Sequence, residues 1–411
     1  MNRVPDVLLS PRGLARFHSG HPWIFRADVG GDEPPGDADS VRVLDGAGRV
    51  VGSAFWAPPP SPTCLRVYAR GGEYVPFSDE LLAERLARAE ARRKEIYGHG
   101  TPAYRLAHAE ADLLPGLFVD RYGDAAVLQA ATIAMDRREK TVAHILAKQH
   151  GIRLVVARDD GSMRDHESLP RRKQVLLGGG PTLMHLVEAG ATRELDLLED
   201  AKTGGFLDQR ENHLCAAALA RGEVLDAFTY HGGFALAMAR RAEKVLGLDE
   251  DPRAVARAKR NASLSHVGNA EFQVADAFEA LRRFEREGRT FDVVVVDPPA
   301  LAKRRGEITT ALRAYQELNL RALRIVRQDG WVITCSCSGK VTPQLFGEML
   351  VRAAQGAKRD VALVERRGAG RDHPVLVGVP ETEYLKCWFL KVVSSGKALG
   401  ASLLPRATRA D

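Results

Sequence analysis

The second half of the chain alternates short apolar runs with segments of helical composition. The apolar runs are residues 224–228, 245–248, 271–274, 291–296, 331–335 and 384–393. The helical segments are residues 234–242, 252–263, 310–327 and a stretch that begins near 342. A short apolar run bounded by turn residues is typical of a buried strand, and strands that alternate with helices require a parallel sheet. The pattern predicts an α/β domain, followed by a loose tail at residues 396–411.

The first part of the chain has a different pattern. Residues 49–56 and 64–68 are β-like runs in a stretch rich in Gly and Pro, which predicts a small β domain over residues 1–73. A charged helix is expected at residues 79–97, because apolar side chains recur there at helical spacing. We therefore place a domain boundary at residues 74–78.

A middle α/β block follows this helix. Its expected elements are two strands within 104–129, a helix at 137–149, a strand at 154–158 and a β-hairpin over 184–198. We see no catalytic constellation in this block and interpret the acids Glu110, Asp112 and Asp120 as structural.

The segment 223–249 holds the most informative loop of the chain. A strand ends in Asp226-Ala-Phe, a Thr-Tyr-His-Gly-Gly loop leads into a helix, and the next strand ends in Asp249, which suits the two hydroxyls of a ribose. Gly232 and Gly233 let a ligand approach the backbone where open α/β sheets bind small molecules. The dinucleotide motif GxGxxG is absent, which favours a nucleoside without phosphates, S-adenosylmethionine (AdoMet). An ordinary turn with solvated acids is the alternative.

Acids near the ends of further strands fit the same ligand. Asp276 follows the third strand, where a carboxylate can accept a hydrogen bond from the adenine amino group. Asp297 precedes two prolines, which stiffen the loop and remove two amide donors, so that its surroundings favour the amino group of a nucleobase. Asp208 and Arg210 lie shortly before the first strand. They either border the cofactor pocket or form a salt bridge at a helix start.

Cys337 is the candidate nucleophile. It lies where a strand gives way to a loop and then to a helix with Thr342 as its N-cap. A thiolate that adds to carbon 6 of cytosine or uracil makes carbon 5 able to attack the AdoMet methyl group. Cys335 lies inside the strand, and the alternative is that both cysteines are small buried apolar residues. No second Cys or His pair has the spacing of a zinc site, so we expect no metal.

Composition changes this interpretation only slightly. The chain has 411 residues, a formal net charge of +6 and five cysteines. The charge permits a nucleic-acid partner without requiring one. An odd number of cysteines and no signal-peptide pattern favour reduced thiols in a cytoplasmic protein, and no apolar run is long enough to cross a membrane. Basic and aromatic residues at 10–25 form either a small RNA-facing surface or the core of a β-barrel.

Taken together, these motifs resemble the bacterial PUA-domain 23S ribosomal RNA cytosine-5 methyltransferase family. The resemblance covers roughly residues 8–393, and the ordered set of motifs is far more specific than any one of them. The matching motifs are Gly20-His-Pro-Trp-Ile-Phe, Leu114-Pro-Gly-Leu, Lys202-Thr-Gly-Gly-Phe-Leu-Asp-Gln-Arg-Glu-Asn, Asp226-Ala-Phe-Thr-Tyr-His-Gly-Gly-Phe, Asp297-Pro-Pro-Ala, Ser336-Cys-Ser-Gly, Asp372-His-Pro-Val and Tyr384-Leu-Lys.

The resemblance implies a PUA-like RNA-binding β-barrel at 1–73, a central α/β domain with a β-hairpin at 78–187 and a Rossmann-like class I methyltransferase domain at 188–395. It implies AdoMet as cofactor, 23S ribosomal RNA as partner and 5-methylcytosine as product, with Cys337 as nucleophile and Asp297 beside it. A homodimer is compatible with it. The cofactor-binding residues expected from the motifs and the resemblance together are Asp208, Arg210, Asp226, Phe228, Gly232, Gly233, Asp249 and Asp276.

The chain departs from the family pattern at two places. Asp200-Ala201 stands where Gly-Gln is usual, and His213 replaces a usual Arg. Ala300 stands where relatives with two catalytic cysteines carry the second one. Two other functions therefore stay open. One is methylation of a base amino group or of guanine, with Cys337 inert. The other is an RNA-binding assembly factor with a degenerate catalytic domain.

Overall fold

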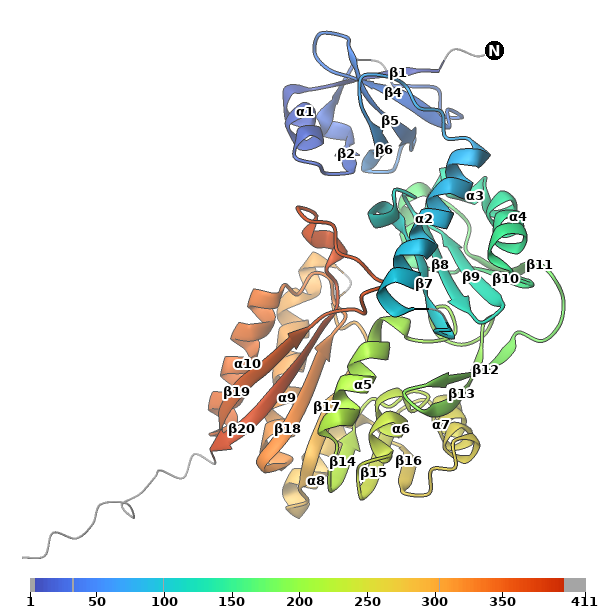
Figure 1. Cartoon of the computed structure of the whole chain (residues 1–411). Coiled ribbons are helices and arrows are strands. Elements are labelled where there is room, and N and C mark those ends of the chain that lie inside the picture. The colour runs from blue at the N-terminus through green and yellow to red at the C-terminus, as the bar shows by residue number, and fades with distance from the viewer. Residues whose placement is uncertain (1–3, 32, 99, 303, 395–411) are drawn as a thin grey trace, which may run out of the picture. The chain divides into compact units, whose positions relative to one another are not determined.

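The computed structural model describes residues 4–394 except 32, 99 and 303 (Figure 1). It contains two compact units, each built from separate stretches of the sequence. The first unit holds the chain through Glu188, then Arg193–Arg210 and Gly370–Glu383. The second unit holds Ala189–Thr192, Glu211–Ala369 and the chain from Tyr384 onward. Neither unit is therefore a continuous segment.

A six-stranded sheet forms the N-terminal part of the first unit, where the sequence predicted a small β domain. Its strand order is β2-β6-β5-β4-β1-β3. Its elements are β1 (Asp6–Leu9), α1 (Pro11–His18), β2 (Trp23–Phe25), β3 (Val29–Gly30), β4 (Ser40–Leu44), β5 (Val50–Trp56) and β6 (Thr63–Arg70). Helix α1 begins where the Ser10 hydroxyl accepts the Gly13 N–H at 3.1 Å.

Strand β2 contributes one residue to the core of this sheet. Ile24 is completely buried, and Trp23 is half-buried with its indole N–H donated to Glu110 at 2.8 Å. Of the two interpretations of residues 10–25, the core is therefore correct for Ile24, whereas Trp23 is half-buried.

A five-stranded sheet forms the central part of the first unit, in the order β11-β10-β9-β8-β7. Its elements are α2 (Asp79–Tyr97), β7 (Ala103–His108), β8 (Leu117–Tyr122), β9 (Ala125–Ala130), α3 (Ile133–Asp136), α4 (Glu139–His150), β10 (Leu154–Asp159) and β11 (Arg172–Leu177). One apolar cluster joins Phe55 and Tyr68 of the N-terminal sheet to Phe77 and to Leu82 and Leu86 of α2. The two sheets therefore share a core across the predicted boundary at 74–78.

The predicted hairpin is confirmed as the pair β12 (Leu183–Glu188) and β13 (Ala191–Asp196). The predicted tail at 396–411 lies outside the described residues.

The second unit is a Rossmann-like sheet of seven strands in the order β16-β15-β14-β17-β18-β20-β19. Strand β20 is antiparallel to both neighbours, and the other pairs are parallel. The strands are β14 (Glu223–Asp226), β15 (Lys244–Asp249), β16 (Ala270–Val274), β17 (Phe291–Val296), β18 (Val326–Ser336), β19 (Asp360–Arg367) and β20 (Lys386–Ser394). The helices are α5 (Arg210–Leu219), α6 (Gly233–Ala239), α7 (Pro252–Leu264), α8 (Ala277–Glu287), α9 (Ile308–Ile325) and α10 (Pro343–Ala357).

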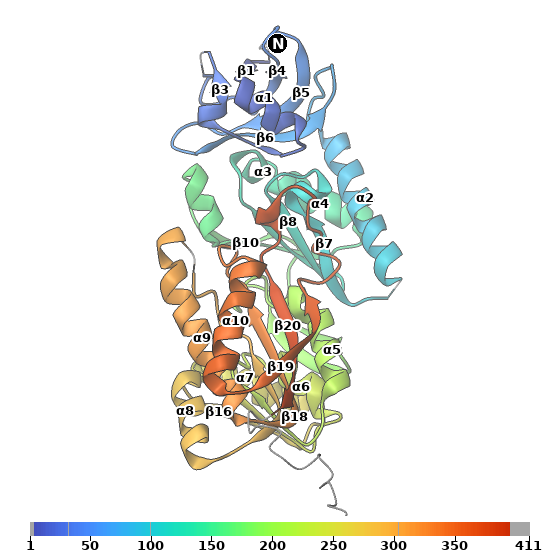
Figure 2. The same ribbon diagram turned by 90° about the vertical axis from the view of Figure 1, so that its left-hand side faces the viewer.

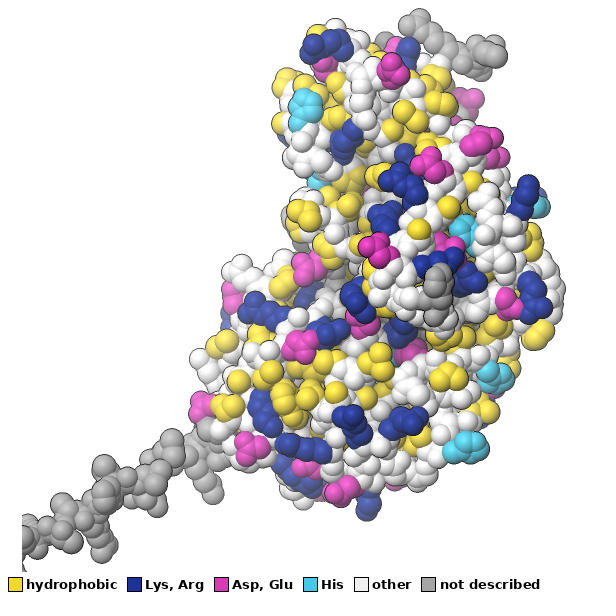
Figure 3. Space-filling model, in the orientation of Figure 1, with side chains coloured by type: hydrophobic (Ala, Val, Ile, Leu, Met, Phe, Trp, Pro, Cys, Tyr) yellow, Lys and Arg dark blue, Asp and Glu magenta, His cyan; other side chains and the backbone are white. Residues whose placement is uncertain are grey.

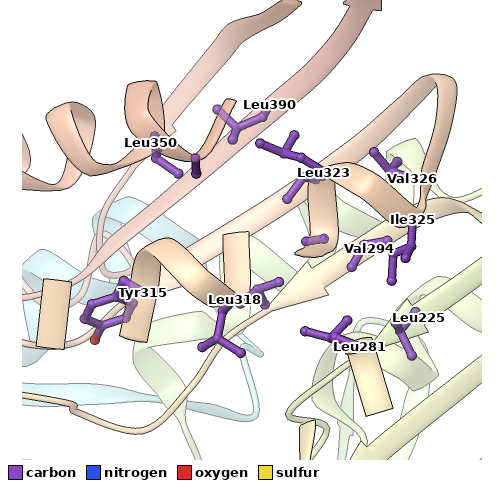
Figure 4. Packing of buried hydrophobic residues seen from close by; sticks show 14 of the residues in the cluster. Leu225, Leu281, Val294, Tyr315, Leu318, Leu323, Ile325, Val326, Leu350 and Leu390 are labelled. Carbon is purple, nitrogen blue, oxygen red and sulfur yellow. The ribbon is translucent and has the colours of Figure 1, made fainter. Parts of the chain in front are cut away.

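Both faces of this sheet are buried, and successive residues of β17 serve opposite faces. Val293 and Val295 pack in the cluster that contains α5, α6 and α7 side chains, whereas Val294 and Val296 pack against α8, α9 and α10. Figure 4 shows Val294 near Leu225, Leu281 and the side chains of α9. Helices α9 and α10 lie side by side along the sheet (Figure 2). Within the described residues, no helix combines the length and apolar character that a bilayer crossing requires.

Truncating Phe346 should weaken this core strongly. Its ring is completely buried in α10, 5.2 Å from the Trp388 ring and 6.0 Å from the Tyr315 ring. We expect Phe346→Ala to lower the free energy of unfolding by about 3–5 kcal/mol, because it leaves a cavity among large side chains. Val351→Ala is the matched control on the same helix, since Val351 is 57% exposed and its loss should change stability by less than about 0.5 kcal/mol. Urea unfolding followed by circular dichroism measures both, and equal effects would contradict this packing.

Candidate active site

Four of the predicted site residues lie where neighbouring strands of the second unit end. Asp226 closes β14 and Asp249 closes β15, whereas Asp297 and Cys337 directly follow β17 and β18. These strands are parallel, so their carboxyl ends meet at one edge of the sheet. The chain turns toward opposite sides of the sheet after β14 and after β17. Open α/β sheets bind their ligands at such a reversal of strand order.

The loop after β14 is held by backbone hydrogen bonds to its neighbours. The Thr229 N–H is donated to the Leu248 carbonyl at 2.7 Å, and the Gly232 N–H to the Thr229 carbonyl at 2.7 Å. The Tyr230 N–H is donated to Asp249 Oδ2 at 2.8 Å. The strand-end acid of β15 therefore fixes the loop of β14, which confirms that the two segments form one structure.

The two predicted glycines are required because the loop passes close to neighbouring side chains. Gly232 has φ +88°, a backbone conformation that residues with a side chain rarely adopt. A Cβ on Gly233 would lie 2.7 Å from His213 Cε1. His213 is 3% exposed and its ring packs edge-on against Phe234 at 4.5 Å. The residue that replaces the usual family Arg therefore lies beneath the glycine loop as a packing residue. Phe228, at the start of the loop, is half-buried against the apolar cluster of α8 and α9.

Asp226 is a buried acid with spare accepting capacity. Its Oδ2 accepts the Ala235 N–H at 3.1 Å, and its buried Oδ1 has no partner at hydrogen-bond distance. Burial raises the pKa of Asp226 to about 7, with an opposing contribution from Thr229 and further upward contributions from Asp297 and Asp249. A buried acceptor beside a glycine loop fits a ligand that brings an amino donor and positive charge, as AdoMet does.

Asp276 lies after β16 but is already used by the fold. Its side chain is exposed and caps α8 by accepting the Glu279 N–H at 2.8 Å. One carboxylate oxygen can still accept a hydrogen bond from a ligand. Its assignment to the adenine amino group stays a prediction.

The two cysteines of the Thr-Cys-Ser-Cys-Ser run have different surroundings. Cys335 is completely buried inside β18, paired with Cys387 of β20. Cys337 is half-buried, one residue beyond the end of β18, and its Sγ lies 4.0 Å from the Pro298 carbonyl oxygen. The structure thus brings the Cys337 thiol to the Asp297-Pro-Pro loop, as the sequence predicted. Thr342 is the N-cap of helix α10, and its hydroxyl accepts the Leu345 N–H at 3.2 Å.

Asp208 and Arg210 fall in the first unit, at the end of its second stretch. Asp208 is buried, and Lys202 Nζ donates to it at 2.7 Å. Asp208 therefore forms a salt bridge, and its partner is Lys202. The Arg210 guanidinium lies over the Tyr97 ring at 4.3 Å and 3.8 Å from Asp372 Oδ2. Their proposed place at the cofactor pocket stays a prediction.

A buried polar network of the first unit gathers motifs whose role the sequence did not reveal. Arg105 donates to Asp120 through Nε and Nη2, at 2.5 and 2.9 Å, and Thr203 donates to the same carboxylate at 2.6 Å. The Arg105 N–H is donated to Asp372 Oδ2 at 2.8 Å, and His373 Nδ1 lies 2.8 Å from Asp372 Oδ1. The interpretation of Asp120 as structural agrees with this network. The sequence signal that could have revealed this network is the presence of charged residues inside otherwise apolar segments.

One group of acids has the spacing of metal ligands. The carboxylates of Asp136, Glu139 and Asp159 lie close together, but arginines supply the positive charge. Arg172 donates to Asp136 at 2.7 Å and to Glu139 at 2.8 Å, and Arg164 donates to Asp136 at 2.6 Å. Burial and the neighbouring Asp159 raise the pKa of Glu139 to about 8. The group therefore forms an ion-pair cluster.

The departure at residues 200–201 has a local explanation. Asp200 Oδ2 accepts the Asp196 N–H at 2.6 Å, and the Asp200 N–H is donated back to the Asp196 carbonyl at 3.1 Å. Asp200 thus closes the turn that follows the hairpin. This role needs a short side-chain acceptor, which a glycine lacks.

Comparison with known proteins agrees with this architecture. Residues 96–378 match the profile of the S-adenosylmethionine-dependent methyltransferase family, and residues 7–70 match a PUA-like domain. A protein of Shewanella denitrificans named ribosomal RNA large subunit methyltransferase I is 34% identical over 92% of this chain and 97% of its own. A protein of the same name from Tolumonas auensis is 32% identical over 89% of this chain and 94% of its own.

Solved structures show the same fold. A chain described as a SAM-dependent methyltransferase from Streptococcus mutans superposes with a TM-score of 0.79 at 18% identity, covering 95% of this chain and all (100%) of that one. The methyltransferase SMU.776, solved with S-adenosylhomocysteine (SAH), gives a TM-score of 0.80 at 19% identity with the same coverage. The family match, the full-length relatives and the strand-end loop agree, and AdoMet is the cofactor that they imply. This chain belongs to the S-adenosylmethionine-dependent methyltransferase family, with a PUA-like domain at its N-terminus.

Proposed function

We propose that this protein transfers the methyl group of AdoMet to carbon 5 of a cytosine in 23S ribosomal RNA, with Cys337 as the nucleophile. The observation that carries the proposal is the place of the Cys337 thiol, at the end of β18 and 4.0 Å from the Pro298 carbonyl. The names of its relatives, which match over nearly their whole length, support ribosomal RNA as the substrate.

The residues at the strand ends have distinct parts in this reaction. AdoMet, when bound, supplies an electrophilic methyl group. The Cys337 thiolate adds to carbon 6 of the ring, which makes carbon 5 nucleophilic. The methyl group is then transferred to carbon 5, and SAH is the second product. A base removes the carbon-5 proton, the bond between sulfur and carbon 6 breaks, and the thiolate is regenerated. Asp297 accepts from the exocyclic amino group and so presents the ring to Cys337.

The cofactor residues follow from the loop geometry. Asp226 offers its spare oxygen to the amino group of AdoMet, and Asp249 accepts from the ribose hydroxyls. Gly232 and Gly233 let the loop pack closely on its neighbours, since side chains at either position would be strained or would strike them. Phe228 and Asp276 complete the site expected within this unit.

The N-terminal domain is proposed to contribute RNA affinity. The basic side chains of α1 are partly neutralised, because Arg12 and Arg16 both contact Asp28, at 2.6 and 2.8 Å. On the face shown in Figure 3, Lys and Arg side chains are interspersed with Asp and Glu. Two arginines on one carboxylate leave a net positive charge, which can meet phosphate groups.

Replacing Cys337 should abolish methyl transfer and leave AdoMet binding intact. We expect Cys337→Ala to be inactive on ribosomal RNA, whereas Cys335→Ala, a change of the buried neighbour on the same run, stays active. RNA with 5-fluorocytosine at the target should form a denaturation-resistant complex with the unmodified protein, because fluorine cannot leave as a proton does. The measurements are gel electrophoresis of the complex and mass spectrometry of the product nucleoside. Full activity of Cys337→Ala would contradict this mechanism, and so would a methylated amino group or guanine as the product.

Asp249→Ala should weaken AdoMet binding by about tenfold or more, because a charge-assisted hydrogen bond contributes roughly 1.5–3 kcal/mol. The substitution also removes the acceptor of the Tyr230 N–H. Glu250→Ala, the exposed acid next in sequence, is the matched control and should bind AdoMet normally. Calorimetry decides, and an unchanged affinity in a folded Asp249→Ala protein would remove this residue from the site.

AdoMet affinity should depend on pH through Asp226. A carboxyl whose pKa is raised to about 7 is protonated below that pH, and the protonated form cannot pair with the positive ligand. Affinity should therefore rise as the pH increases through about 7, and fall by up to about tenfold for each pH unit below it. Asp226→Asn should bind more weakly and without this dependence. A pH-independent affinity of the unmodified protein would show that Asp226 stays ionised or does not touch the ligand.

A further inference from the structure

Lys386 is a buried lysine at the start of β20. Its side chain is 1% exposed, and the residue pairs with Ser336 of β18 in the sheet register. Its Nζ donates to the Ser338 carbonyl and to the Tyr384 carbonyl, both at 2.8 Å. Burying an ammonium group is costly unless the fold uses it, so these bonds require an explanation.

Ser338 joins three other elements to the same point. Its Oγ accepts the Ala302 N–H at 3.1 Å, at the end of the loop that begins with Asp297. The Tyr315 hydroxyl of α9 lies 3.0 Å from the same Oγ. Ser338 is 1% exposed. The residue next to Cys337 is therefore held through its carbonyl by β20 and through its hydroxyl by α9 and by the Asp297 loop.

Charged or titratable groups lie near Cys337 on several of the described elements. Asp297 follows β17, Tyr315 lies on α9 and Lys386 lies on β20. Burial raises the pKa of Tyr315, which favours the neutral form of its hydroxyl. Lys386 contributes the positive charge of this group, one residue away from the thiol along the Ser338 backbone.

We propose that Lys386 is a positioning residue for Cys337. Its ammonium fixes the Ser338 carbonyl, and with it the direction of the thiol toward the Asp297 loop, and its charge favours the thiolate. The inference rests on the proposed function, because it assigns Lys386 a part in the attack by Cys337. It also makes a statement about the thiol itself, which can be tested without RNA.

The test compares Lys386→Met with Lys391→Met in the full chain. Lys391 is the matched control, since it also lies on β20 and donates to a backbone carbonyl, that of Asp329. We expect Lys386→Met to lower kcat for RNA methylation by about tenfold or more, the scale of one charge-assisted hydrogen bond, with AdoMet affinity unchanged. The pH of half-maximal alkylation of Cys337 by iodoacetamide, followed by mass spectrometry of its peptide, should rise by about one unit, because a nearby cation lowers a thiol pKa. Lys391→Met should change neither quantity.

The alkylation profile separates this inference from the proposed function. If the product is not 5-methylcytosine but the Cys337 profile still shifts in Lys386→Met, the proposed function fails and the positioning role stands. An unshifted profile together with an unchanged kcat would overturn the role of Lys386. If Lys386→Met does not fold, Tyr315→Phe is the second variant. It removes the hydroxyl that contacts Ser338 Oγ and should lower kcat several-fold. An unchanged kcat in a folded Tyr315→Phe protein would equally overturn the proposal.

Discussion

Parallel pairing of β14 with both β15 and β17 is the constraint on which the second unit depends. It sends the chain away in opposite directions after β14 and after β17, and it brings Asp226, Asp249 and Asp297 to one edge of the sheet. Side chains packed on the two faces of the sheet bury both sides of β17, which is why its residues 293–296 are all valines. No motif makes the site alone. The site exists because the loops of separate strands are forced to share one edge.

The sequence predicted the elements of this sheet wherever one physical signal dominated. Buried strands were found because apolar runs end at turn residues, and α9 was found within about two residues of its bounds. Helix α8 was missed, although Asp276 is a good N-cap and Ala277, Ala280, Leu281 and Phe284 recur at helical spacing. Strand β19 was missed because it is an edge strand, and its exposure does not alternate as a half-buried strand's would.

The candidate site was predictable in position but not in detail. Strand ends and glycines located the Asp226 loop, and the sequence order of Cys335 and Cys337 distinguished the buried thiol from the accessible one. Long-range polar contacts were not predictable, because nothing local marks them. Arg93 donates to the Asp372 carbonyl across 279 residues of sequence, and Lys386 donates to the Ser338 carbonyl across 48. The segment at residues 10–25 stayed open between surface and core for the same reason. Its polar neighbours are typical of a surface, while strand pairing places Ile24 in the core and leaves Trp23 half-buried.

The discontinuous first unit has a consequence for how the chain is made. Arg93 and Arg105 emerge from the ribosome with the first quarter of the chain, but Asp372, which holds both, emerges near the end. The Arg93 guanidinium and the Arg105 backbone N–H therefore lack this acceptor until nearly all of the second unit has been synthesised. The N-terminal unit cannot finish folding before the C-terminal one has appeared, so maturation is tied to completion of the whole polypeptide.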